Sequence, residues 1–480
     1  MTFPPILVAD TRHFSQRRFP PLYGFAAKNN VPIWAEKSRS AWWERVDGYR
    51  RFADRLAPHR RSLQGLSLAE LKAHRYRGIG VLACAGDEML CLLSRRRQAG
   101  PAPESNAEAI AQALGAADGR EELLLCMAAT QDWVDFWHRL LDRKGPFLCA
   151  VVDRGRAIHS RTLLEVASVR GIRTFVTDRF PIGRHLFFEE RSPSGAHLSA
   201  LADPDWCRRL VLPSDLAERE RVRAEAHRRL APIRAAVAAR PASEELAAAC
   251  NPPAGDMALV LGGSPEEPSL LDPPLAEAAP PTLCRRLIAG ILDHTDLRAV
   301  FHAGVPLAAR LGAWRDALPA SEQGRFRLAG TARLEILLSQ AKLVVSLSAP
   351  LTFAACRAGL KPVQFGRTVL AGRGFTHDFA GPDELRDKLA AGPLDGVLSL
   401  GEYRRFEDFL ARLVLLHLVP EGDEGVRKIA ARLAEPGHVP TLRECDFGAA
   451  PPASRWSTLA KAVANPTAAR RLAATWSDPD

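Results

Sequence analysis

The sequence predicts an α/β protein with two Rossmann-like domains facing each other across a cleft and helices at the C-terminal end. Short apolar runs alternate with segments of helical length in both halves, which is typical of parallel sheets covered by helices. The 480 residues are too many for one ordinary core and favour two domains of roughly 200 residues each. Several apolar runs end in turns rich in glycine and polar residues, where open α/β sheets bind ligands.

The first domain is expected over residues 1–212. Its predicted strands cover residues 5–10, 31–34, 79–84, 122–126, 147–152 and 172–176. Its predicted helices cover residues 23–29, 40–56, 66–74, 132–142 and 160–169. The dinucleotide fingerprint G-x-G-x-x-G is absent from this half, so we expect a Rossmann-like sheet without a nicotinamide or flavin dinucleotide.

A linker helix is expected between the domains, over residues 213–255. Ala, Arg, Glu and Leu dominate residues 213–240, Ser214-Asp215 supplies a helix start signal, and Pro252-Pro253-Ala254-Gly255 ends the segment. The second domain then covers residues 256–400. Its predicted strands are 257–261, 298–302, 325–328, 343–345 and 362–366, and its predicted helices are 283–292, 331–341 and 383–391. Residues 401–480 should form helices at 402–418, 427–434 and 457–475 that pack back on the domains.

Composition limits the classes of function. Hydrophobic residues make up 47% and charged residues 25%, which suffices for packed cores. No apolar run approaches the ~18 residues of a membrane span, and no signal peptide is evident at the N-terminus. We therefore expect a cytoplasmic location, with peripheral contact to the inner membrane as a further option. The nine cysteines are scattered without C-x-x-C spacing and favour buried free thiols over disulfides or zinc ligands.

The net charge of +10 indicates anionic partners or simply an arginine-rich bacterial proteome. Nucleic acid, the anionic inner leaflet and acidic sugars all fit such a charge. Nucleic acid has the least support, because no RNA-binding motif accompanies the basic residues.

The most informative stretch is residues 341–379, where an apolar run, a small-residue helix and a second apolar run predict a β-α-β unit. A glycine-rich turn, Ala371-Gly372-Arg373-Gly374-Phe375-Thr376-His377-Asp378, follows. Glycine lets backbone amides approach a ligand closely, and a helix N-terminus nearby favours an anion. A plain surface turn is the alternative interpretation.

This stretch resembles the signature of the capsular polysaccharide biosynthesis/export family, the Kps-type bacterial Kdo-transferase-like proteins. The matching positions are Ser346, Leu347, Ser348, Phe353, Ala355, Gly359, Pro362-Val363, Phe365-Gly366, Ala371-Gly372, Gly374, Thr376 and Asp378. Three positions depart from the signature: Thr352 replaces Gly, Ala354 replaces Glu and Arg373 replaces Trp.

The same resemblance extends weakly into the first domain. Arg156 and His159 fall on the family's R-x-Y-H-R, and Asp178 falls on the second acid of E-E-G-Y, whose first acid is replaced by Thr177. Glu189 matches a further acid, and Arg184 lies near a replaced Arg-Pro pair. On the residues alone, Glu189 fits a solvated charged patch and His159 a capping or packing histidine.

Two more positions of the second domain fit the resemblance. Gly262 and Ser264 belong to a glycine turn after the strand at 257–261, where Gly263 replaces the family's Gln. His302 ends the next strand, at the place of the family's His-Pro pair; a capping or surface histidine is the alternative.

The resemblance implies a glycosyltransferase of the GT-B plan, which needs no metal and no cofactor. It would transfer Kdo or a related sugar from a CMP-activated donor to a lipid or glycan acceptor, with capsule assembly proteins as further partners. The implied donor-binding residues are Gly262, Ser264, Ser348, Thr352, Gly372, Gly374, Thr376 and Asp378. The implied catalytic residues are Asp178, Glu189 and His302, and Arg156, His159 and Arg184 are acceptor-binding or structural.

The departures also fit a second class of function. Polar residues are lost at 177, 263 and 354, while the apolar frame is retained. A catalytically impaired pseudo-glycosyltransferase that binds a glycan or protein in capsule assembly is therefore the alternative. No P-loop or nucleophile triad suggests another enzyme class.

Overall fold

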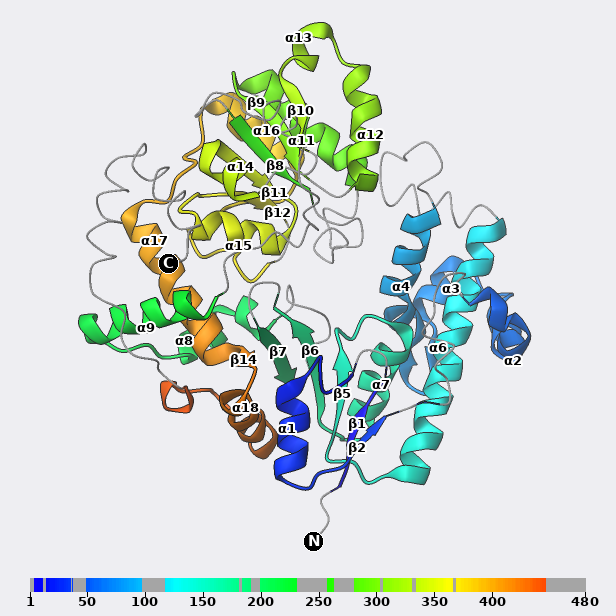
Figure 1. Cartoon of the computed structure of the whole chain (residues 1–480). Helices are drawn as coiled ribbons and strands as arrows, with labels where there is room; N and C mark the ends of the chain where they lie inside the picture. The colour runs from blue at the N-terminus through cyan, green and yellow to red at the C-terminus, as the bar shows by residue number, and fades with distance from the viewer. Residues whose placement is uncertain are drawn as a thin grey trace.

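The computed structural model describes residues 4–11, 14–35, 37, 49–96, 117–180, 184–190, 199–230, 257–262, 280–302, 305–329, 334–365 and 368–445. These residues form two α/β domains, one above the other in Figure 1, each built on a largely parallel sheet. The predicted fold class is therefore correct.

The first sheet has the strand order β14-β7-β6-β5-β1-β2. Its strands are β1 (Ile6–Val8), β2 (Ile33–Ala35), β5 (Cys149–Asp153), β6 (Thr174–Arg179), β7 (His185–Glu190) and β14 (Val419–Pro420). The strands from β2 to β6 are parallel, whereas β7 is antiparallel to β6 and β14 is antiparallel to β7. The C-terminal part of the chain thus supplies an edge strand to the first domain.

Helices cover both faces of this sheet. The side chains of Ile6 and Val8 pack with α1 (Pro20–Lys28) and α18 (Asp423–Ala434) on one face. On the other face, Leu7 and Val152 pack with α6 (Ala117–Lys144) and α7 (Ile158–Val169). Successive residues of a strand point to opposite faces, so the continuous apolar runs of β1 and β5 supply both cores.

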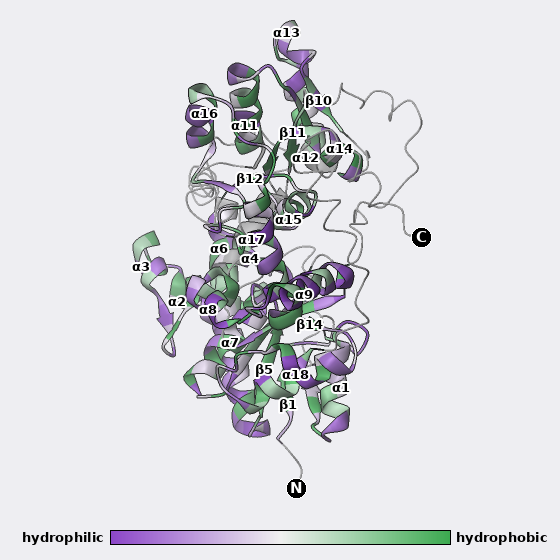
Figure 2. Ribbon diagram, turned by 90° about the vertical axis from the view of Figure 1, so that its left-hand side faces the viewer, coloured by the Kyte–Doolittle hydropathy of each residue, from purple (hydrophilic) through white to green (hydrophobic). Residues whose placement is uncertain are grey.

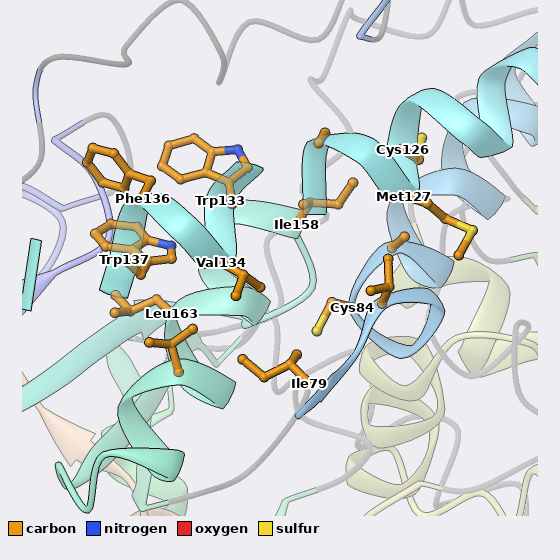
Figure 3. Close-up of a cluster of buried hydrophobic side chains, with 14 of the residues drawn as sticks. Ile79, Cys84, Cys126, Met127, Trp133, Val134, Phe136, Trp137, Ile158 and Leu163 are labelled. Atoms are coloured by element: carbon orange, nitrogen blue, oxygen red, sulfur yellow. The ribbon is translucent and has the colours of Figure 1, made fainter. Parts of the chain in front are cut away.

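Two predicted strands of the first domain are wrong, because residues 79–84 and 122–126 are mostly helical. The structure has α4 (Val81–Arg96) and the 28-residue α6 in these places. Figure 3 shows the reason: Cys84 of α4 and Cys126 of α6 belong to one buried cluster with Trp133 and Ile158. A short apolar run gives the same pattern in a buried helix as in a buried strand.

Smaller elements lie beside α4 and α6. They are η2 (Arg50–Phe52), α2 (Ala53–Leu63), α3 (Leu68–Ala73) and the hairpin of β3 (Arg75–Tyr76) and β4 (Ile79–Gly80). Of the helix predicted over 40–56, residues 40–48 lie outside the described part of the chain. The predicted strands at 5–10, 31–34, 147–152 and 172–176 are confirmed within two or three residues at their ends.

The second sheet is parallel throughout, with the order β10-β9-β8-β11-β12-β13. Its strands are β8 (Met257–Leu261), β9 (Arg298–His302), β10 (Phe326–Leu328), β11 (Ala341–Ser346), β12 (Val363–Phe365) and β13 (His377–Phe379). One face packs on α11 (Pro280–His294), α12 (Val305–Asp316) and α16 (Pro382–Ala391), and the other on α14 (Leu334–Gln340) and α15 (Ala349–Arg357). The short helix α13 (Ala320–Gln323) precedes β10.

Later helices connect the two domains. The chain leaves the second domain through α17 (Leu400–Ala411), which continues as a π-helix, η8 (Arg412–His417), down to β14 (Figure 1). Beside α17 lies α9 (Leu216–Arg229), the described part of the predicted linker helix. The elements η5 (Ala200–Ala202), α8 (Pro204–Arg209) and η9 (Leu442–Glu444) complete this layer. The helix predicted over 457–475 lies outside the described residues.

An aromatic cluster joins the domains. The ring of Phe180, just after β6, lies edge-on to Phe353 of α15, with 5.5 Å between centroids. Phe353 in turn contacts Phe406 of α17 at 5.4 Å. Phe187 of β7 and Phe375 of the glycine-rich turn belong to the same core. We call these five residues the interdomain aromatic cluster. It brings Phe353 and Phe375 of the second domain against Phe180 and Phe187 of the first.

The distribution of hydrophobic residues fits this arrangement. Figure 2 shows them on the strands of both sheets, while helices such as α9 are largely hydrophilic. Among the described helices, none is both long and apolar enough to cross a membrane. Seven cysteines whose side chains are described are free thiols, six of them buried.

Candidate functional site

The site candidates lie where the carboxyl ends of both sheets meet. Asp178 is near the end of β6, directly opposite Phe187 of β7, so both side chains are on the face that bears the interdomain aromatic cluster. Its carboxylate is 15% exposed and accepts a hydrogen bond of 3.0 Å from Nε of Arg154. Burial raises the pKa of Asp178, although the charges of Arg154 and Arg156 and the backbone N–H of Arg179 act in the opposite direction.

Arg154 was missed by the sequence analysis. It follows β5 with φ of 57°, and Gly155 after it has φ of 62°. The Arg154 N–H donates to the carbonyl of Thr177 (2.8 Å), which fixes this turn to β6 beside Asp178. The signal in the sequence that could have indicated Arg154 is an arginine followed by a glycine immediately after a strand end. Arg156, which was predicted as a site residue, is half-buried in the same loop.

Asp10 and His159 form a second polar pair at this edge. Asp10 follows β1, and its Oδ2 lies 3.0 Å from Nε2 of His159 in the first turn of α7. The two residues are only 1% and 3% exposed, and the imidazole lies against the ring of Trp133. This environment fits the packing interpretation of His159 better than contact with an acceptor.

The N-terminus of α7 already holds an anion supplied by the chain. The Glu88 carboxylate accepts a 2.7 Å hydrogen bond from the Ile158 N–H and a 3.0 Å bond from the Tyr49 hydroxyl. A helix N-terminus attracts negative charge, and here the buried Glu88 satisfies it. A substrate phosphate therefore has better candidates elsewhere on this edge.

Glu189 lies on the same face as Asp178 but further from the carboxyl edge, opposite Val176. Its carboxylate accepts hydrogen bonds from the Ser199 hydroxyl, the Ala200 N–H (2.9 Å) and Nε2 of His417 (2.6 Å). Burial, the largest influence, favours a raised pKa, but His417 and the other donors together lower the pKa of Glu189. Its lone pairs are thus largely used in joining β7 to η5 and the π-helix.

On the second-domain side of the interdomain aromatic cluster, β11 leads into a serine-rich turn and then into α15. The Ser346 hydroxyl donates to the Ser348 carbonyl (3.0 Å), and the Thr352 hydroxyl donates to the same carbonyl (2.9 Å). Ser348 and Thr352 are both buried, and Ser348 occupies the N-cap position of α15. These predicted donor-binding residues shape the first turn of α15.

The glycine-rich turn is held by one carboxylate. Asp378 accepts hydrogen bonds from the Gly372 N–H (2.7 Å), the Thr376 hydroxyl (2.8 Å) and the Gln364 amide (2.5 Å). Gly372 and Gly374 have φ of 71° and 78°, a conformation that favours glycine. Thr376 and Asp378 therefore build the turn from within, and Gln364 of β12 is a contributor that the sequence analysis missed.

Arg373 links this turn to the first domain. Its guanidinium donates to the carbonyls of Val369 (2.7 Å) and Leu201 of η5, and lies 4.5 Å above the ring of Phe409. The position that departs from the family signature thus makes a contact between the domains.

His302 and Gly262 lie at the ends of β9 and β8. The Gly262 N–H donates to the His302 carbonyl (2.9 Å). The His302 imidazole is 4% exposed, and its Nδ1 has no hydrogen-bond partner within the described ranges. Burial lowers the pKa of His302, and the charge of Glu335 acts in the opposite direction. Ser264 lies outside the described residues.

Two remaining features lie outside this arrangement. Arg184, at the start of β7, is 87% exposed and lies 3.7 Å from Glu421 beside the edge strand β14. A cavity of about 460 Å³ lies between α1 and β2 and is lined by Tyr23, Asn30 and Ile33, at the amino edge of the first sheet. Among the described residues, no group of His, Cys, Asp and Glu could hold a metal ion.

Comparison with known proteins gives similarities of low degree. No family model and no curated protein sequence matches the chain. Among solved structures, it is similar to the β-Kdo 2,7 transferase KpsC of Thermosulfurimonas dismutans, with 15% identity, a TM-score of 0.35, and coverage of 59% of this chain and 81% of that one. It is also similar to the ADP-heptose LPS heptosyltransferase II of E. coli, with 14% identity, a TM-score of 0.24, and coverage of 59% and 80%.

A third similar structure is the UDP-GlcNAc 2-epimerase of Methanocaldococcus jannaschii in complex with UDP-GlcNAc and UDP. The identity is 11%, the TM-score 0.29, and the coverage 84% of this chain and 97% of that one. Because these TM-scores are low, the two-domain architecture rests on the strand order of the two sheets, and membership of the capsule family stays a prediction.

Proposed function

We propose that this chain is a metal-independent glycosyltransferase that transfers Kdo or a related acidic sugar from a CMP-activated donor to a hydroxyl of a lipid or glycan acceptor. One observation carries the proposal: the 5.5 Å contact between Phe180 and Phe353 brings the edge that bears Asp178 against the start of α15. The motif resemblance of residues 346–378 supports the choice of donor.

In this proposal, the second domain binds the donor nucleotide. The amides at the start of α15 and the Gly374 amide of the glycine-rich turn would face its phosphate, because a helix N-terminus favours negative charge. Backbone N–H groups that are already in place stabilise the charge that develops on the leaving phosphate without having to move, so no metal is required.

Asp178 would be the base. The acceptor hydroxyl oxygen forms a bond to the anomeric carbon, the bond from that carbon to the phosphate oxygen breaks, and CMP leaves with the electron pair. The hydroxyl proton passes to the Asp178 carboxylate. A base is most effective when its pKa is near the working pH, so the raised pKa of Asp178 favours this role over that of Glu189, whose pKa is lowered.

A thermal-shift panel with CMP, CMP-Kdo, UDP-GlcNAc and ADP-heptose tests donor binding. We expect CMP and CMP-Kdo to raise the melting temperature, since a ligand at 100 times its dissociation constant stabilises the folded state by about 2.7 kcal/mol. No shift with any of the four would contradict the proposal.

The contacts of several polar groups favour a second candidate, a pseudo-glycosyltransferase that binds a glycan or protein partner. Thr376 and Asp378 are engaged within their own turn, Glu189 is engaged with His417, and Glu88 fills the N-terminus of α7. If this second candidate is correct, no nucleotide in the panel should bind. The protein should instead be retained on immobilised acidic glycans.

A further inference from the structure

Arg154 occupies a backbone conformation that is uncommon for its residue type. Its φ of 57° lies in the left-handed region, where a side chain crowds the backbone, and Gly155 continues in the same region with φ of 62°. The hydrogen bond from the Arg154 N–H to the Thr177 carbonyl holds the turn in place. Backbone strain of this kind is concentrated at ligand-binding and catalytic positions.

The Arg154 side chain uses only part of its capacity to donate hydrogen bonds. Its Nε donates to Asp178, while neither terminal nitrogen has a hydrogen-bond partner within the part of the chain that the structure describes. The side chain is 62% exposed and lies at the edge of the first sheet that bears Asp178. A guanidinium presents a planar pair of N–H groups that matches a carboxylate or a phosphate.

The hydrogen bond from Arg154 has a strong influence on Asp178 because of the groups that surround the Asp178 carboxylate. Phe187 lies opposite Asp178 on β7, and Phe180 follows two residues later on the same face. The charged groups that influence the carboxylate are Arg154, first by its charge and then by its hydrogen bond, and more weakly Arg156. The neighbouring backbone N–H of Arg179 also donates to it. Arg154 is therefore the main group that favours the ionised form of Asp178.

We propose that Arg154 is the receptor for an anionic group of the substrate, a carboxylate or a phosphate, and that binding this anion draws its guanidinium away from Asp178. The inference rests on the proposed glycosyl transfer, because it assigns a substrate group to that site. It makes Asp178 a stronger base only when the substrate is present, so the free enzyme keeps the carboxylate paired.

The test is a titration of the Asp178 carboxyl carbon by NMR in the full chain labelled with ¹³C-aspartate, with Asp178→Asn identifying the signal. Inorganic phosphate and acetate are the probes, and no turnover is required. We expect saturation with at least one of them to raise the pKa of Asp178 by about one unit, the equivalent of a tenfold change in proton affinity. A response to phosphate alone assigns the anion as a phosphate, and a response to acetate alone assigns it as a carboxylate.

Arg154→Asn is the test variant, because asparagine tolerates the left-handed region and lacks the guanidinium. In this variant, we expect the pKa of Asp178 to be raised already without a probe and to respond to neither anion. Arg386→Gln is the matched control: it removes an exposed cation of α16 that is paired with Asp383 and Asp387, and the pKa of Asp178 should respond to the anions as in the unmodified chain. Arg154→Lys keeps the positive charge but lacks the planar pair of N–H groups. It should bind the anion to which the unmodified chain responds at least tenfold more weakly.

An equal response of Arg154→Asn and the unmodified chain would overturn the inference, and so would the absence of any response to both anions in the unmodified chain. If Arg154→Asn does not fold, Arg154→Lys decides in the same way. A chain that shows the anion response but transfers no sugar would refute the proposed function and leave the anion receptor standing.

Discussion

The rings of Phe180 and Phe353 meet edge-on, with centroids 5.5 Å apart, although the two residues belong to different domains and are separated by about a third of the chain. Phe180 follows β6 of the first sheet and Phe353 lies on α15 beside the second. Aromatic pairs in this geometry are stabilising beyond the area they bury. The contact therefore fixes the distance between Asp178 and the start of α15, on which the proposed chemistry depends.

Replacement of Phe353 by alanine should loosen this joint. The ring is buried and also contacts Phe406 of α17, so Phe353→Ala should lower the free energy of unfolding by about 3–5 kcal/mol. Denaturant unfolding measures the change. Phe52→Ala is the control, because Phe52 is only partly buried and far from the joint; an equally small effect of both changes would show that the cluster does not hold the domains together.

The buried pair of Glu189 and His417 should make stability depend on pH. The Trp206 indole donates to Nδ1 of His417 (3.4 Å), so Nε2 carries the proton of the neutral ring and donates to Glu189. Burial lowers the pKa of His417 below its ordinary 6.5, and the donors lower the pKa of Glu189 below its ordinary 4.5.

For both groups the unfolded chain binds protons more readily than the folded chain, so stability is complete above about pH 6.5 and is lost as the pH falls. Glu189→Gln should lower the free energy of unfolding at pH 7 by about 1–3 kcal/mol, because a charged hydrogen-bond acceptor is removed. It should also flatten the decline below pH 4.5. Urea unfolding between about pH 3 and 8 measures both effects; an unchanged slope below pH 4.5 in the variant would contradict the assignment.

Gly374 offers a test of the glycine-rich turn that separates folding from binding. An alanine there must adopt φ of 78°, with its Cβ 3.5 Å from the Arg405 guanidinium, and should cost about 1–2 kcal/mol of stability. Gly437→Ala is the matched control, because φ is 70° and no atom lies within 4 Å of its Cβ. Both variants should melt alike, but only Gly374→Ala should weaken CMP binding in calorimetry. Equal CMP affinities would remove the turn from the donor site.

Gln364 should organise the same turn from the strand side. Its amide donates to Asp378 (2.5 Å) and accepts from the Thr368 hydroxyl (2.8 Å). Gln364→Leu removes both hydrogen bonds and leaves the buried Thr368 hydroxyl without its acceptor, so it should destabilise the protein by about 1–3 kcal/mol and reduce CMP affinity. The control Gln323→Leu alters an exposed amide that contacts only backbone carbonyls and should change neither quantity.

Most strands of the second domain could be predicted from sequence because its central strands are parallel and almost entirely buried, which makes them continuous apolar runs such as 257–261. The first domain was harder for a physical reason. The apolar runs at 79–84 and 122–126 have the composition of buried strands, but α4 and α6 bury them as helices. The short edge strands β13 and β14 left no pattern of their own, because pairing with distant partners defines them.

The candidate site was predictable only where a residue follows a strand end. That rule placed Asp178 and the glycine-rich turn at the carboxyl edges of the two sheets. It could not show that Glu189 points to the same face but is held by His417, a residue 228 positions away in the chain. Arg154 and Gln364 were missed for the same reason, because their importance comes from the neighbours that the fold gives them.

In the proposed sugar transfer, Asp178 removes the proton of the acceptor hydroxyl. The direct measurement is the initial rate of CMP release from CMP-Kdo in the presence of a lipid extract that contains Kdo-terminated glycolipids, with spontaneous hydrolysis subtracted. We expect Asp178→Asn to lower this rate at least ~100-fold with CMP affinity unchanged. Asp142→Asn, a control at an exposed ion pair with Arg170, should leave the rate unchanged. Equal rates for Asp178→Asn and the unmodified protein would contradict the account.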